Sequence, residues 1–283
     1  MVSTTAAEEI RAPAGYARRF TEVTVFVAVW MALGFALGDL YLYLLVGVPL
    51  TVVFQLVVRR RLLRELWVRD GQAFHLDRKG KVIAGALMIL PVITLVLTAG
   101  QWLLSVWLMA CVVGAVPAAY AICHLRSDSV RITVRWTAIA TVAGVAAMVA
   151  SLVPLLIASP EPLRSSSMLV TGLHTAILLI PALFVLEEVT FRGALDSHVH
   201  GPGDGRVWLS ALFVSTLFGL WHLPIVVGTS QGVLATVAQL LVVHWVIGVP
   251  LSFAWRRTGS LVAPGLAHAL INGVRDALYA GLS

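Results

Sequence analysis

Long apolar segments, repeated along the whole chain, constrain this sequence more than any other feature. A helix needs about 20 apolar residues to cross the hydrocarbon of a bilayer. In lipid, each segment must also satisfy its own backbone hydrogen bonds, which a helix does. We therefore predict an all-α fold, a polytopic membrane helix bundle of about eight to nine transmembrane helices. The nine candidate segments are 22–38, 40–58, 82–100, 102–124, 137–158, 168–192, 207–227, 233–255 and 260–281.

The composition supports a membrane protein over a soluble one. Hydrophobic residues make up 59% of the 283 residues and charged residues only 12%, whereas soluble domains carry about 25% charged residues. The net charge is +6, but the basic residues lie in short segments between apolar runs. That distribution is typical of membrane topology signals, so we do not expect a nucleic-acid partner. The two cysteines lie in apolar stretches and are interpreted as small hydrophobic residues.

The basic residues also predict an orientation. Lys and Arg gather in the N-terminal tail and in every second loop after it, at 59–81, 126–135, 206 and 256–257. Because cytoplasmic loops are enriched in Lys and Arg, we expect a cytoplasmic N-terminus in a multi-pass protein of the cell (plasma) membrane. No secretory signal precedes the first apolar segment, so that segment is expected to direct membrane insertion.

Two adjacent carboxylates end the sixth apolar segment. Ionisable residues inside a membrane are costly, so each is a candidate for function. Glu188 and Arg192 are four residues apart, which lets them pair on one helix face. Glu187 then points about 100° away and is available for chemistry. The alternative is that the membrane ends here and both acids meet lipid headgroups.

Two later segments carry the other polar candidates. His222 lies in the seventh segment, and His268 and Asn272 lie four residues apart in the ninth, so that they share a helix face. Each group alone could be a structural hydrogen bond between membrane helices. In the predicted topology, however, all three groups fall within about one to two helical turns of a common depth. That agreement favours a single polar site.

These three groups resemble the motifs of the CPBP (Abi) family, the intramembrane glutamic endopeptidases that include type II CAAX prenyl proteases and bacteriocin-processing enzymes. The family pattern is EExxxR, then FxxxH, then HxxxN. It is matched here by Glu187, Glu188 and Arg192, by Phe218 and His222, and by His268 and Asn272. The resemblance covers about residues 168–275. It implies an intramembrane protease.

The resemblance also implies a role for each motif residue. Glu187 would be the general base that activates water, assisted by His222. Glu188 would be held by Arg192. His268 and Asn272 would donate hydrogen bonds to the oxyanion of the tetrahedral intermediate. We expect no cofactor; the alternative is Zn²⁺ on Glu187, His222 and His268.

The resemblance further implies a substrate class and a division of the chain. The substrate would be a membrane-associated peptide, either lipidated and CAAX-like or a leader peptide, and the bilayer would be the other partner. We divide the chain into a cytoplasmic tail at 1–21, membrane helices of unassigned role at 22–160 and a catalytic core at 161–283. The rival hypotheses are a non-catalytic immunity or scaffold protein, and a transporter, although no repeated halves are found.

The remaining polar features receive structural interpretations. Gly228–Gly232 matches GxSxG and Gly201–Asp204 mimics GxGD, but both fall in loops between membrane segments and are interpreted as turns. His174 and His244 are expected to make structural hydrogen bonds. Arg275 and Asp276 are expected to mark the outer membrane interface.

Overall fold

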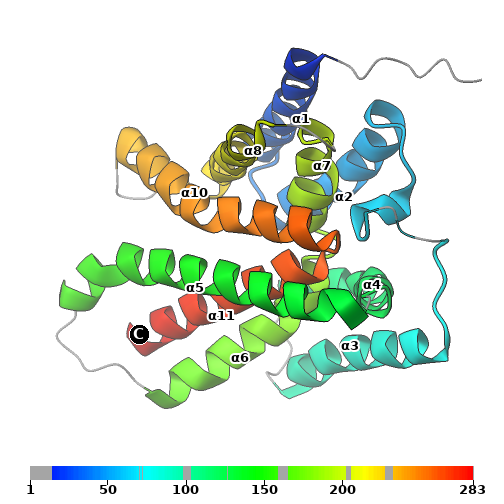
Figure 1. Cartoon of the computed structure of the whole chain (residues 1–283). Coiled ribbons are helices and arrows are strands. Elements are labelled where there is room, and N and C mark those ends of the chain that lie inside the picture. Colours follow the sequence, from blue (N-terminus) through cyan, green and yellow to red (C-terminus); the bar gives the residue numbers. More distant parts are fainter. Residues whose placement is uncertain are drawn as a thin grey trace, which may run out of the picture.

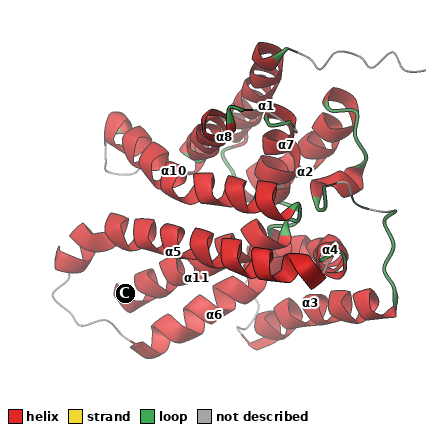
Figure 2. Cartoon of the chain, viewed as in Figure 1, coloured by secondary structure: helices red, strands yellow, loops and turns green. Residues whose placement is uncertain are grey.

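The computed structural model describes residues 15–69, 71, 73–97, 103–125, 127–158, 165–201, 205–226 and 232–282. These residues form helices joined by short connections (Figure 2), and their only β-type pairing is an isolated bridge between Val68 and Ser260. The prediction of an all-α fold is therefore confirmed. The cytoplasmic tail predicted at 1–21 lies mostly outside the described residues, as do most residues of the two motif-like loops.

Each predicted apolar segment overlaps with one long helix. The long helices are α1 (Tyr16–Leu37), α2 (Leu40–Val53), α3 (Arg78–Leu97), α4 (Leu103–Cys123), α5 (Ser127–Ala158), α6 (Ser165–Ala182), α8 (Val207–Trp221), α10 (Val233–Thr258) and α11 (Val262–Leu282). Shorter elements complete the fold: the π-helices η1 (Phe54–Val58) and η3 (Val189–Asp196), the 3₁₀-helix η2 (Leu63–Leu66), α7 (Ser197–Val199) and α9 (Leu223–Val226).

Five helical segments among the described residues are long and apolar enough to cross a membrane. They are Tyr16–Leu37, Leu40–Val58, Ser129–Val153, Val207–Val226 and Val233–Thr258, and Leu108–Cys123 and Met168–Ala182 are shorter apolar helices. Helix α11 is not among the five, because the polar side chains of its second half lower its hydropathy. The chain is thus a multi-pass helical membrane protein, while a total of eight or nine crossings stays a prediction.

The sixth predicted segment differs most from expectation. We expected one continuous helix through Arg192, but α6 ends at Ala182 and a turn at 183–186 leads into the π-helix η3. Pro181 lies in the last turn of α6, where its ring disrupts regular helical bonding. The indole nitrogen of Trp67 donates to the carbonyl oxygen of Phe184 at 2.7 Å and so satisfies one backbone group of the turn.

Two groups of helices surround this turn (Figure 1). Helix α11 packs between α5 and α6, and α10 packs against both α8 and α5. Helices α3 and α4 pair with each other, and α4 also contacts α6. On the other side, α1, α2 and α8 contact η3 or α7. The turn before η3 therefore lies where the C-terminal helices meet the N-terminal ones.

An aromatic cluster joins α1 and α2 to this centre. Trp30 and Tyr43 are buried against Trp221, with ring centroids 5.0 Å and 5.2 Å from it. The Trp30 indole donates to the Tyr43 carbonyl at 2.8 Å, and the Tyr43 hydroxyl donates to the Trp221 carbonyl at 2.7 Å. Helices α1 and α2 thus support the backbone immediately before His222.

Candidate active site

Glu188 is a fully buried carboxylate with a cationic group on one side and an imidazole on the other. One oxygen accepts a hydrogen bond from Nδ1 of His268 at 2.8 Å, and the other lies 3.4 Å from Nε of Arg192. Neither Glu188 nor Arg192 has any exposed side-chain surface. The pairing of Glu188 with Arg192 follows the expected spacing of four residues, and the contact with His268 joins η3 to α11.

Glu187 points to the other nitrogen of the same histidine. Its Oε2 lies 3.7 Å from Nε2 of His268, and 13% of its side chain is exposed. This exposure is to a cavity of about 710 Å³, which Glu187 lines. The two adjacent glutamates therefore differ in environment: Glu188 is enclosed by its partners, while Glu187 faces open space.

His222 is the C-cap residue that follows α8, and its ring lines the same cavity. Its Nδ1 lies 2.8 Å from the carbonyl oxygen of Phe218. A carbonyl oxygen can only accept a hydrogen bond, so Nδ1 carries the proton. In the neutral ring, Nε2 is then an acceptor directed away from α8. This tautomer suits a group that receives a proton.

Asn272 completes the set on α11, one helical turn beyond His268. It is 9% exposed and, like His268, it lines the cavity. The predicted polar residues therefore divide into two sets. Glu187, His222, His268 and Asn272 face the cavity, while Glu188 and Arg192 lie behind it within the protein.

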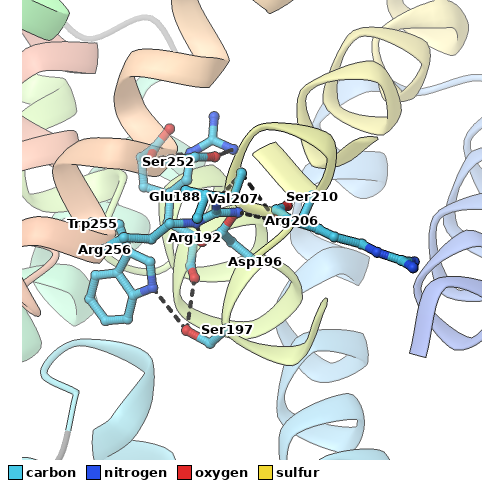
Figure 3. Close-up of polar contacts among 10 residues, drawn as sticks. All are labelled: Glu188, Arg192, Asp196, Ser197, Arg206, Val207, Ser210, Ser252, Trp255 and Arg256. Carbon is cyan, nitrogen blue, oxygen red and sulfur yellow. Dashed lines mark hydrogen bonds and ion pairs between the residues drawn. The ribbon is translucent and has the colours of Figure 1, made fainter. Parts of the chain in front are cut away.

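Further polar contacts fix η3 behind the site (Figure 3). Arg256 of α10 makes a bidentate ion pair with Asp196, with nitrogen–oxygen distances of 2.9 Å and 2.6 Å. The same guanidinium binds Ser210 at 3.1 Å. One turn earlier, Arg192 lies 3.4 Å from the hydroxyl of Ser252. The middle and the C-terminal end of η3 are thus tied to α10, which restricts the position of Glu188.

The N-terminal helices hold η3 from the opposite side. The hydroxyls of Thr51 and Thr190 are 2.6 Å apart, and Arg59 donates to the carbonyl of Gly193 at 3.0 Å. A Cβ atom on Gly193 would lie 2.2 Å from the carbonyl oxygen of Leu66, so this contact requires glycine. We had assigned no role to this half of the chain, and its packing on η3 supplies one.

The three side chains considered as zinc ligands line the cavity. Glu187, His222 and His268 were the alternative ligands for Zn²⁺. Among the described residues, no three His, Cys, Asp or Glu side chains are grouped so that they could hold a metal ion. One ring nitrogen of each histidine bonds to Phe218 or to Glu188, and Nε2 is the nitrogen that would remain for a metal ion. The zinc alternative stays a prediction, and we derive no step through a metal.

Four residues that received structural or interface interpretations from the sequence also line the cavity, namely His174, His244, Arg275 and Asp276. The His244 ring lies against that of His222, with centroids 4.3 Å apart, and its Nδ1 is 2.7 Å from the carbonyl of Leu240. Arg275 was expected to mark the outer membrane interface, which stays a prediction, and it also lines the cavity. The spacing of seven residues between His268 and Arg275 could have indicated this, because it places them on one helix face.

A comparison with known protein families matches the segment that carries the three motifs. Residues 167–274 match the model of the Rce1-like family, described as type II CAAX prenyl endopeptidase Rce1-like. The chain carries an Rce1-like domain. This confirms the resemblance to the CAAX proteases, and it indicates a protease, hence a hydrolase. No curated protein and no solved structure matches the chain. All the motif residues lie within the matched residues of the Rce1-like domain.

Proposed function

We propose that the protein is a glutamic-type intramembrane endopeptidase that hydrolyses a peptide bond of a membrane-associated substrate. The substrate class is a lipidated, CAAX-like peptide or a leader peptide. One observation carries the proposal: within the Rce1-like domain, a carboxylate, two imidazoles and an amide from three different helical segments line one cavity.

The first step forms a bond between a water oxygen and the scissile carbonyl carbon. Glu187 takes the proton of the attacking water, and the bare Nε2 of His222 accepts a second hydrogen bond from it. Collapse of the tetrahedral intermediate then breaks the C–N bond. The proton held by Glu187 passes to the leaving amine, so that one water and one peptide bond give one carboxylic acid and one amine.

His268 and Asn272 stabilise the negative charge on the intermediate. Both side chains line the cavity from one face of α11, and an N–H of each would donate to the oxyanion. Glu188 accepts a hydrogen bond from Nδ1–H of His268, which orients the ring and compensates its charge when Nε2 also carries a proton. Arg192 holds Glu188 in place. Glu188 and Arg192 are therefore positioning residues in this mechanism.

The proposed orientation places the N-terminus in the cytoplasm and the protein in the plasma membrane. The alternation of basic loops supports this proposal. In this orientation the site lies nearer the cytoplasmic face, and the substrate would approach from that side.

The test compares the wild-type protein with Glu187→Gln in membranes and in purified form. Mass spectrometry of peptide termini would identify cut ends that disappear in the variant. Glu65→Gln is the matched control, because Glu65 lies in η2 and does not line the cavity. We expect Glu187→Gln to abolish cleavage and Glu65→Gln to preserve it. Identical termini in all three proteins would refute proteolysis and favour a scaffold or immunity role.

A further inference from the structure

A cation lies in the cavity beyond the proposed catalytic residues. Among the described residues that line the cavity, Arg275 is the one Lys or Arg. It stands on α11 on the same face as His268 and Asn272, three residues beyond Asn272. The proposed hydrolysis does not use Arg275, so the presence of its charged guanidinium in the cavity requires another explanation.

The guanidinium is held from one side only. Nε of Arg275 donates to Oδ1 of Asp276 at 2.7 Å, and the other oxygen of Asp276 accepts from the hydroxyl of Thr175 at 3.0 Å. These contacts engage both oxygens of Asp276. In the described structure they leave the two terminal nitrogens of Arg275 without a bonded acceptor.

Close packing of α6 on α11 sets this arrangement. Cβ atoms on Gly172 and Gly273 would lie 3.0 Å and 2.7 Å from the carbonyl oxygen of the facing glycine. The two backbones therefore meet where only glycine fits. This contact brings Thr175 within reach of Asp276, and the tethered Asp276 then orients Arg275.

We propose that Arg275 binds the free C-terminal carboxylate of the peptide that is cleaved. This inference rests on the proposed endopeptidase function and adds an anionic subsite to it. A guanidinium with two free terminal nitrogens matches a carboxylate in a bidentate pair. His268 and Arg275 are seven residues apart, which is about 10 Å along a helix. That distance is the length of about three extended residues, so a scissile bond at Glu187 and a carboxylate at Arg275 fit one short C-terminal segment.

The experiment uses the purified full-length protein and one fluorogenic peptide in two forms. The peptide carries an S-prenylated cysteine followed by three residues, and it ends in a carboxylate or in a carboxamide. We expect the wild type to prefer the carboxylate by about 10- to 100-fold in kcat/KM, as a charge-assisted pair implies. Arg275→Gln should abolish this preference through KM and leave cleavage of the carboxamide unchanged.

Two further variants sharpen the result. Arg275→Lys retains the charge but not the planar fork, so the preference should fall to about threefold to tenfold. Arg257→Gln is the control, because Arg257 is exposed at the end of α10 and does not line the cavity; it should keep the full preference. Equal cleavage of both peptides by the wild type would overturn the proposal. Equal slowing of both by Arg275→Gln would also overturn it, and would point to a lipid headgroup or a structural role.

A binding measurement separates this inference from the proposed function. In the Glu187→Gln background, the affinity of the labelled peptides is measured without turnover, with and without Arg275→Gln. Preferential binding of the carboxylate that depends on Arg275 supports the subsite even if no cleavage is found in the wild type. Equal binding of the two peptides refutes the subsite even if cleavage depends on Glu187.

Discussion

Replacement of Glu188 by Gln tests the electrostatic arrangement behind the site. The substitution keeps the shape of the side chain but removes its charge. One acceptor remains for Nδ1 of His268, which lies 2.8 Å away in the native protein. The new amide group, however, would face the guanidinium of Arg192, so that two donors oppose each other in a region with no exposed side-chain surface.

The expected magnitude follows from this burial. Removing one partner of a buried ion pair typically costs about 3–5 kcal/mol, because the other charge is left uncompensated. We expect Glu188→Gln near the upper end of that range. Arg192→Met should cost about 3 kcal/mol, since Glu188 would keep its hydrogen bond to His268. The double variant should be less destabilised than the sum of the single variants, by about 2 kcal/mol.

The assay is equilibrium unfolding in detergent micelles, followed by tryptophan fluorescence, for the wild type, both single variants and the double variant. The control Glu65→Gln should stay within about 0.5 kcal/mol of the wild type. Two outcomes would show that no coupled buried pair exists. In the first, the stability losses of the two single variants add up to that of the double variant within about 0.5 kcal/mol. In the second, Glu188→Gln is as stable as the wild type.

Three other predictions address the support of the site and its chemistry. Gly193→Ala should destabilise the protein by about 1–3 kcal/mol in the same assay, because the new methyl group would meet the Leu66 carbonyl. An unchanged midpoint of the unfolding transition would show that η2 and η3 separate easily. Tyr43→Phe should lower the free energy of unfolding by about 1–3 kcal/mol, because the buried Trp221 carbonyl loses its donor. The same variant should have a lower kcat. Full stability and activity would contradict the supporting role of α2. Extended dialysis against a strong chelator should leave cleavage unchanged, whereas loss of cleavage that zinc restores would contradict the metal-free mechanism.

The sequence was most informative where charge appears in apolar segments. Glu187, Glu188, His222, His268 and Asn272 were selected because ionisable or amide side chains are costly in lipid. Four of them line the cavity, and the fifth, Glu188, lies directly behind it. Local spacing sufficed for the contact of Glu188 with Arg192, since both belong to one helical segment.

Features that depend on tertiary packing could not be predicted from these patterns. Pro181 lies in the last turn of α6, but the position of the π-helix η3 depends on the contacts of Thr190, Gly193 and Asp196 with other segments. His244 was interpreted as a structural residue because nothing local relates α10 to α8. Its place beside His222 results from the crossing of those two helices.

The turn between α6 and η3 has a consequence for the boundaries of the enzyme. Irregular backbone is tolerated at membrane depth only where protein covers it, and here the Trp67 indole satisfies the Phe184 carbonyl from outside the segment that matches the family. Excision of residues 165–283 would remove the Trp67 donor from this carbonyl. We therefore expect a transplanted Rce1-like segment to need α2 and η2, which contact η3.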